Sequence, residues 1–129
     1  MAVHPVGGID HLGRGATAQG PFGPDAPRRS VTAVTGAFLA TRRDVFEVIG
    51  GFDDEGLPLW FNDVDYCLRA WAKGLRVLYE PAITAVHYES ATLGPALADL
   101  VRDVHFEAAA RLMRERWGEA MVRDSFNVF

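Results

Sequence analysis

The sequence lacks several features that define large classes of protein. It has a single cysteine, Cys67, so an internal disulfide framework and a multi-cysteine zinc site are both excluded. No apolar run approaches the roughly 20 residues of a membrane-spanning helix, and the N-terminus lacks the charged-then-apolar layout of a secretory signal. From these absences we expect a cytoplasmic protein.

Positive charge and phosphate-binding motifs are also scarce. The formal net charge is −4, whereas a general nucleic-acid partner requires a basic surface. Neither a G-x-x-x-x-G-K-S/T loop nor a strand-bound G-x-G-x-x-G is present. The remaining composition, with 49% hydrophobic and 23% charged residues over 129 positions, is typical of one globular domain.

Glycine and proline are concentrated in residues 1–30, where only isolated apolar residues occur between them. This composition predicts a loop or a partly ordered lead. We therefore divide the chain into this lead, residues 1–30, and a domain formed by residues 31–129.

The segment 62–74 has the pattern of an amphipathic helix. Its apolar residues recur at i, i+3, i+4 and i+7; they are Val64, Cys67, Leu68 and Trp71. Because Cys67 lies on this stripe, we expect its thiol to be buried and unreactive.

Two carboxylates, Asp63 and Asp65, fall on the first turn of this helix. Asn62 is suited to the N-cap, and Asp65 three residues later completes a pair that resembles a capping box. Lys73 and Gly74 predict the end of the helix. Carboxylates at a helix N-terminus stay ionised and can serve as caps, bases or ligands, and capping is the commonest of these uses.

Three strands are predicted around this helix. Residues 31–41, 75–79 and 83–88 have the β-branched and apolar composition of strands. Gly36, inside the first of them, predicts a bulge or a close approach by another backbone or a ligand.

Two further helices complete an α/β arrangement. Asp44 and Glu47 predict a capped short helix that ends at residues 50–51. A final helix is predicted over residues 95–117, stopped by Gly118. The expected core positions of the two helices are Val45, Phe46, Ile49, Leu97, Leu100, Val101, Val104, Ala108 and Leu112.

The candidate polar cluster consists of Asp63, Asp65 and His87. One histidine and two carboxylates suit a hard metal ion or acid/base chemistry, but His87 is equally consistent with a hydrogen-bonded residue at a strand end. Trp60, next to the carboxylates, suits either stacking on a sugar or packing as a hydrophobic staple. These residues alone indicate an α/β domain with a candidate acidic site.

Three blocks of sequence indicate a particular protein family. TGAFLATRRDVFEVIGGFDD, FNDVDYCLRAWAKGLRVLYEP and AVHYESAT resemble, in order and spacing, the second half of family-2 glycosyltransferases with the GT-A fold. The flanking GGIDHLGRGATAQGPFG and RERWGEAMVRDSFNV are similar to bacterial members that build surface polysaccharides. The family's usual Glu-Asp pair is Asn62-Asp63 here.

The resemblance implies transfer of a sugar from a nucleotide-diphosphate sugar to an acceptor hydroxyl, with inversion at the anomeric carbon. Asp63 would be the general base, and Asp63→Asn would abolish transfer while leaving folding nearly unchanged. His87 would complete a Mg²⁺ or Mn²⁺ site on the donor diphosphate. Thr35 and Gly36 would line the floor near the donor sugar.

The remaining site residues divide into two groups under the same resemblance. Trp60 and Asn62 would contact substrate. Asp65 and Arg69 would be structural, a cap and a neighbour four residues away that can form an ion pair.

The family's first half, with its nucleotide-binding strands and Asp-x-Asp motif, has no counterpart here. The resemblance therefore implies a partial GT-A fold, with a few strands and three helices, that is inactive alone. Uncovered strand edges and apolar helix faces favour a homodimer or pairing with a donor-side half. Two alternatives remain: a non-catalytic glycan-binding or oligomerisation module, and a small metal-dependent hydrolase that uses Asp63, Asp65 and His87.

Overall fold

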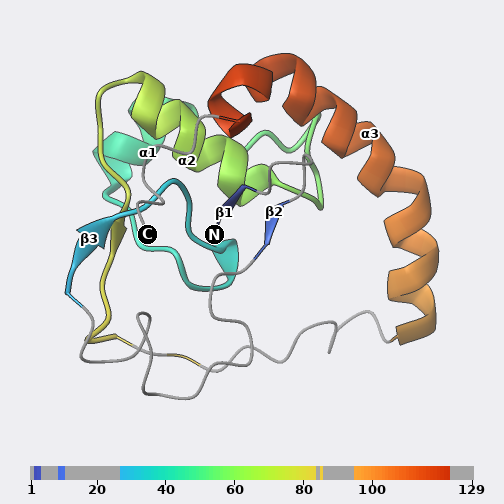
Figure 1. Cartoon of the computed structure of the whole chain (residues 1–129), viewed down its shortest axis with the longest axis horizontal. Coiled ribbons are helices and arrows are strands. Elements are labelled where there is room, and N and C mark those ends of the chain that lie inside the picture. The colour runs from blue at the N-terminus through green and yellow to red at the C-terminus, as the bar shows by residue number, and fades with distance from the viewer. Residues whose placement is uncertain (1, 4–8, 11–26, 84, 86–94, 123–129) are drawn as a thin grey trace.

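The computed structural model describes residues 2–3, 9–10, 27–83, 85 and 95–122, and it mixes helices with short strands (Figure 1). The helices are α1 (Arg43–Ile49), α2 (Asn62–Ala72), α3 (Pro95–Val122) and the 3₁₀ helix η1 (Gly36–Phe38). The strands are β1 (Ala2–Val3), β2 (Ile9–Asp10), β3 (Arg29–Ser30) and β4 (Leu78–Tyr79). Most of the predicted lead, residues 1–30, lies outside the described residues.

The strands form two separate antiparallel pairs, β1 with β2 and β3 with β4. In the second pair Arg29 lies opposite Tyr79, and the amide of Val31 donates to the carbonyl of Val77 at 3.0 Å. An isolated two-stranded ribbon of this length is marginal on its own, so packing of the helices against the neighbouring segments must stabilise this region.

Much of the predicted strand content is wrong. Within residues 31–41 the amide of Val31 donates to the carbonyl of Val77, but no residue of this segment is in a strand and residues 36–38 form η1. Of residues 75–79 only the last two form a strand, and Ile83 and Ala85 are not in strands, while residues 84 and 86–88 lie outside the described part. Apolar and β-branched composition favours a strand only where a partner strand is available.

Helix α1 ends as predicted, but its start differs from the prediction. Gly50 and Gly51 have φ values of 94° and 67°, the left-handed conformation that glycine adopts without steric penalty. Asp44 does not cap the helix, because the N-cap residue is Arg42 and it makes no side-chain cap hydrogen bond. Instead Asp44 accepts from the guanidinium of Arg42 at 3.0 Å.

Helix α2 also begins differently from the prediction. Its N-cap is Phe61, with φ 64°, and no side chain caps it. The expected capping box of Asn62 and Asp65 is therefore wrong, because Asn62 is already helical and Asp65 is engaged elsewhere. The predicted end is confirmed: Lys73 is the C-cap and Gly74 has φ 74°.

Helix α3 is longer than predicted, since it runs through Gly118 to Val122. A single glycine costs about 1 kcal/mol in a helix interior, which does not end a long helix. The predicted core position Ala108 is exposed, whereas its neighbour Ala109 and Met113 are buried and Leu112 is partly buried. The side chains of the other predicted core residues of α3 lie outside the described part; they are Leu97, Leu100, Val101 and Val104.

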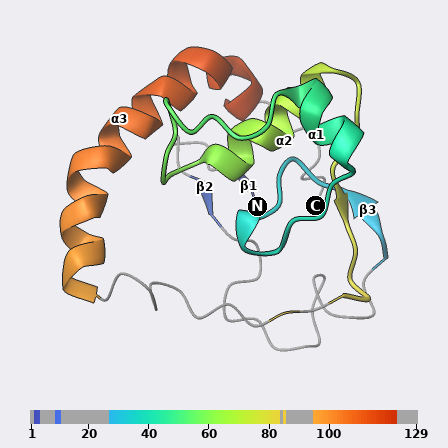
Figure 2. The same cartoon turned by 180° about the vertical axis from the view of Figure 1, so that it is seen from behind.

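The core forms where α2 meets α1 and the C-terminal part of α3, and the two views agree on this arrangement (Figure 1, Figure 2). The apolar stripe of α2 is confirmed, with Val64, Cys67 and Leu68 buried and Trp71 partly buried. Within the described residues, no helix is long and apolar enough to cross a membrane.

Candidate functional site

Asp63 stands at the start of α2 with both of its carboxylate oxygens held by backbone amides. Its Oδ2 accepts from the amide of Gly36 at 2.7 Å, and its Oδ1 accepts from the amide of Val64 at 2.8 Å. The residue as a whole is partly exposed. A carboxylate has about four acceptor positions, so two amides leave room for a further donor.

Gly36 approaches Asp63 closely, as the sequence predicts, although the neighbour is a side chain and not a backbone or a ligand. A Cβ at position 36 would lie 3.3 Å from the Cβ of Asp63, which is tighter than ordinary contact. Next to it, Thr35 Oγ1 accepts from the amide of Ala37 at 3.3 Å and forms the N-cap of η1. Thr35 and Gly36 are thus brought beside Asp63.

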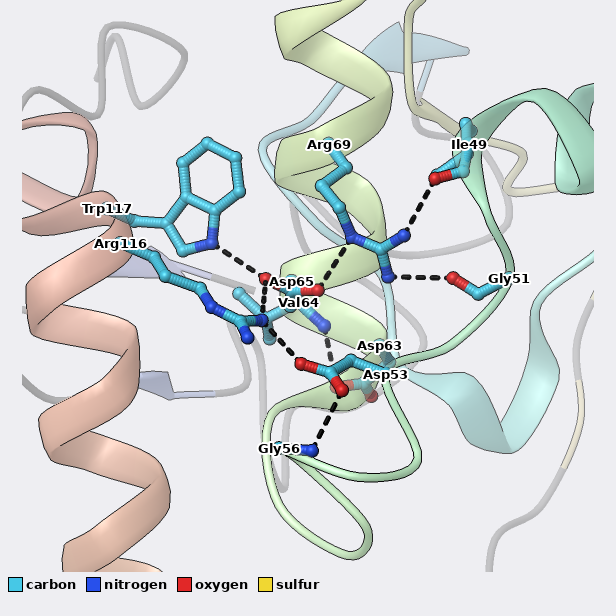
Figure 3. Close-up of polar contacts among 10 residues, drawn as sticks. All are labelled: Ile49, Gly51, Asp53, Gly56, Asp63, Val64, Asp65, Arg69, Arg116 and Trp117. Atoms are coloured by element: carbon cyan, nitrogen blue, oxygen red, sulfur yellow. Dashed lines mark hydrogen bonds and ion pairs between the residues drawn. The ribbon is translucent and has the colours of Figure 1, made fainter.

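Asp65 is fully buried, with 0% exposure, and it is surrounded by donors (Figure 3). Its Oδ2 accepts from Arg69 Nε at 2.7 Å. Its Oδ1 accepts from the indole N–H of Trp117 at 2.9 Å and from Arg116 at 3.4 Å. We call these four residues the Asp65 cluster. A buried carboxylate requires such partners because an unpaired charge in the interior is costly.

Arg69 extends the Asp65 cluster to the end of α1. Besides pairing with Asp65, its guanidinium donates to the carbonyls of Ile49 at 2.9 Å and Gly51 at 2.7 Å. These carbonyls belong to the helix end and the turn after it, where intrahelical donors are lacking. The structural pair of Asp65 and Arg69 is present, but it fixes α2 to α1 and does not cap α2.

Arg116 joins the Asp65 cluster to the loop before α2. Its guanidinium pairs with Asp53 Oδ2 at 2.6 Å, and the other oxygen of Asp53 accepts from the Gly56 amide at 2.8 Å. The Gly56 hydrogen bond and then Arg116 hold the pKa of Asp53 below its usual value. The hydrogen bond to Asp53, and then the charge of Asp53, raise the pKa of Arg116.

Sequence reasoning missed Arg116 and Trp117. They lie 51 and 52 residues after Asp65, so no local spacing connects them to it. The only available signal was the RERWG segment, which the family resemblance includes without giving it a role.

Trp60 and Phe61 pack against Phe106 of α3. The ring centroids lie 5.7 Å apart for Trp60 and 5.2 Å apart for Phe61. Among the described residues, the buried indole N–H of Trp60 has no hydrogen-bond partner. Asn62, also predicted to contact substrate, is partly exposed in the first turn of α2.

The predicted metal ligand, His87, lies outside the described residues. Among the residues that the structure describes, no three histidine, cysteine or carboxylate side chains gather as metal ligands would. Asp65 accepts from two arginines and an indole, so its oxygens are not open to a metal ion. The described residues therefore do not build a metal site by themselves.

An apolar groove with a volume of about 730 Å³ lies beside the candidate site around Asp63. Its walls come from the 31–41 segment, α1, α2 and residues 75–83. Phe38, Leu78 and Ile83 line it while being 59%, 44% and 58% exposed. Cys67 is also in its wall and is buried as expected, and burial raises the pKa of this thiol to about 11.

Three proteins resemble parts of this chain. A protein from Sinorhizobium fredii named only as uncharacterised protein y4gI is 32% identical over 90 residues, 70% of this chain and 10% of that protein. O-antigen biosynthesis protein RfbC of Myxococcus xanthus is 42% identical over 72 residues, 56% of this chain and 6% of the relative. Rhamnosyltransferase WbbL of Escherichia coli K12 is 40% identical over 53 residues, 41% of this chain and 20% of the relative.

These matches support a relationship to glycosyltransferases. The matched part of the chain spans at most 20% of each of these three relatives. No family model matches the sequence. No solved structure matches it either.

Proposed function

We propose that this chain forms the acceptor side of an inverting glycosyltransferase of family 2, with a partial GT-A fold. The observation that carries the proposal is the Asp63 carboxylate, which is partly exposed and held by two backbone amides. The similarity to a rhamnosyltransferase and an O-antigen biosynthesis protein supports the same reaction class.

In the proposed reaction, the acceptor hydroxyl oxygen attacks the anomeric carbon of a nucleotide-diphosphate sugar. The bond from that carbon to the diphosphate oxygen breaks, and the configuration inverts. Asp63 takes the hydroxyl proton on an acceptor position that the two amides leave open. Because the amides hold the carboxylate before substrate arrives, little reorientation is needed at the moment of transfer.

The two aspartates of α2 have different tasks in this proposal. Asp65 is fully buried and accepts from two arginines and an indole, so an acceptor hydroxyl has no path to it. It holds α2 against the end of α1 and α3. Asp63 is the one carboxylate in the first turn of α2 that a substrate can reach.

The remaining site assignments rest on the family resemblance. Thr35 and Asn62 lie on the two segments that flank Asp63, and we assign them to the substrate site. Trp60 packs on Phe106, so in this proposal it shapes the site through α3 and does not stack freely on a sugar. A Mg²⁺ or Mn²⁺ ion with His87 as a ligand stays a prediction, and no step above requires it.

The chain by itself offers no counterpart of the family's donor-binding half. We propose that it is inactive alone and that the apolar groove mediates pairing with a second copy. The three exposed apolar side chains Phe38, Leu78 and Ile83 favour this role. Sedimentation of the wild type and of Phe38→Ser tests it: the wild type should form dimers that the variant weakens. A wild type that stays monomeric at high concentration would contradict pairing.

The proposed activity is tested with the protein from the complete reading frame, by following nucleoside diphosphate released from UDP- or dTDP-sugars. Asp63→Ala should lose transfer to hydroxyl acceptors by about 10²–10⁴-fold, the usual contribution of general-base catalysis. Transfer to azide should survive, because this anion attacks the anomeric carbon without losing a proton. Asp44→Ala is the control, because Asp44 is exposed on α1.

Retention of hydroxyl transfer in Asp63→Ala would show that the base assignment is wrong. If the wild type consumes no nucleotide sugar yet forms a stable dimer, the non-catalytic oligomerisation module is the better function. The groove is the observation that favours this second candidate.

A further inference from the structure

The turn that precedes α1 directs one of its amides out toward Asp63. Within this turn the amide of Ala37 donates to Thr35 Oγ1 at 3.3 Å, and the amide of Phe38 donates to the Thr35 carbonyl at 3.3 Å. The amide of Gly36 instead leaves the turn and donates to Asp63 Oδ2 at 2.7 Å. Of these three consecutive amides, only that of Gly36 contacts the proposed base.

We propose that Gly36 is a positioning residue for Asp63, and not part of the floor beneath the donor sugar. Its amide fixes one carboxylate oxygen, while the Val64 amide fixes the other at 2.8 Å. Since the two donors come from segments 28 residues apart, the carboxylate is held against both η1 and α2. The catalytic consequence of this proposal rests on the proposed function of Asp63 as the general base. The hydrogen-bond geometry does not depend on that function.

The absence of a side chain at position 36 is part of the same arrangement. A Cβ there would lie 3.3 Å from Asp63 Cβ and 3.6 Å from Asp63 Oδ2. A larger residue at position 36 therefore requires Asp63 or the turn to shift by a few tenths of an ångström. Gly36 has no left-handed φ, so the requirement for glycine comes from this contact and not from backbone strain.

The competing explanation is that the hydrogen bond from Gly36 to Asp63 only stabilises the fold. The chain contains a comparable hydrogen bond that has such a structural role. The Gly56 amide donates to Asp53 Oδ1 at 2.8 Å, with the same donor and acceptor types and nearly the same length. Asp53 pairs with Arg116 and has no part in the proposed chemistry. Removing either amide donor should destabilise the fold similarly, but only the Gly36 donor should affect Asp63.

The test replaces the amide N–H of Gly36 by an ester oxygen through semisynthesis of the full 129-residue chain, with the Gly56 ester as the control. Three-bond NMR couplings between Asp63 Cγ and its backbone nitrogen and carbonyl carbon report the Asp63 side-chain rotamer. We expect one rotamer in the wild type and in the Gly56 ester, and averaged couplings in the Gly36 ester. Wild-type couplings in the Gly36 ester would overturn the proposal.

A second arm uses variants that can be expressed in the complete reading frame. Gly36→Ala should lower kcat by less than the roughly 10²-fold that a 1 Å misplacement can cost, because the contact requires a shift of only a few tenths of an ångström. The donor KM should stay unchanged. Gly118→Ala is its control, because a Cβ there meets no atom of the described residues within 4 Å. A raised donor KM with unchanged kcat would assign Gly36 to the donor site and overturn the positioning role. If the wild type proves inactive, the proposed function fails, while the rotamer couplings still decide this inference.

Discussion

Trp117 donates its indole N–H to Asp65 Oδ1 at 2.9 Å, across 52 residues of sequence. Asp65 has 0% exposure. Among the described residues, three side chains donate to it: Arg69, Arg116 and the indole of Trp117. The bond fixes the C-terminal part of α3 to the first turn of α2, where Asp63 lies. The stability of the candidate site therefore depends on a helix distant in the sequence.

Trp117→Phe should lower the free energy of unfolding by about 1–3 kcal/mol, because it leaves a buried charged acceptor short of one donor. Trp71→Phe is the matched control: its indole donates to the main-chain carbonyls of Val31 and Thr32 at 3.3 and 3.1 Å. These acceptors are neutral, so the control should lose less. Urea unfolding of both variants measures the difference, and an equal loss would contradict a special role for the Asp65 contact.

The pairing of Asp53 predicts a pH dependence of stability. Its pKa is lowered in the folded chain, first by the Gly56 amide and then by Arg116. A carboxylate with a lowered folded pKa stabilises the fold above its unfolded pKa, here 3.8, and that stabilisation is lost as pH falls through the folded value. Wild type should therefore lose stability as the pH falls through 3.8 and below.

Asp53→Asn should reduce the loss of stability at acid pH, because the variant lacks the carboxylate that becomes protonated. Urea midpoints measured across the same pH range for both proteins provide the comparison. Asp54→Asn, at an exposed neighbouring position, is the control and should keep the wild-type slope. Parallel curves for wild type and Asp53→Asn would show that Asp53 is not the group responsible.

Cys67 should be protected from thiol reagents in the folded chain. Burial, with 1% exposure, raises the pKa of its thiol from 9.0 to about 11. Two pKa units reduce the thiolate population about a hundredfold at a pH below both values, and only the thiolate reacts. Labelling with iodoacetamide should be slow in the folded chain and fast in urea, and equal rates would mean that the thiol is exposed.

Replacing glycine by alanine should have opposite effects on the stability of the fold in α3 and after α2. In the described part of the chain, no atom lies within 4 Å of a Cβ placed at Gly118, so Gly118→Ala should stabilise the fold by up to about 1 kcal/mol through helix propensity. Gly74 is equally open, but its φ is +74°, so Gly74→Ala should destabilise it. Thermal unfolding of the two variants checks the signs, and a lower midpoint for Gly118→Ala would contradict the helical assignment there.

Helices were predictable from this sequence because their determinants are local. The apolar stripe of α2 repeats within eleven residues, and the glycines after α1 and α2 end those helices wherever they pack. Helix starts were not predictable in the same way. Phe61 takes a left-handed φ of 64° while its ring packs on Phe106, a residue from another helix, and this displaces Asn62 from the N-cap.

The strands and the Asp65 cluster could not be predicted for a related reason. Residues 31–41 have a strand composition, yet none of them is in a strand, although the amide of Val31 donates to the carbonyl of Val77. The donors to Asp65 from α3 lie more than 50 residues away. In contrast, the glycine at position 36 did indicate a close approach, and the structure supplies the neighbour: Asp63.

Asp63→Asn is expected to affect folding as well as chemistry. Both carboxylate oxygens accept backbone amides, whereas an asparagine amide has one acceptor oxygen and one NH₂ donor. The NH₂ group would face the amide of Gly36 or Val64, donor against donor. We therefore expect a loss of about 1 kcal/mol in the free energy of unfolding, which differs from the sequence-based expectation that folding stays nearly unchanged.

Comparison with Asp63→Ala separates the two effects of Asp63→Asn. Alanine removes both acceptors but adds no opposing donor, so urea unfolding should place its stability at or above that of the asparagine variant. Stability of Asp63→Asn equal to wild type would contradict the two-amide geometry. Because asparagine disturbs both the scaffold and the proton acceptor, lost transfer in that variant does not identify a base. Survival of azide transfer in Asp63→Ala does identify the base, because a collapsed site would lose transfer to hydroxyl acceptors and transfer to azide alike.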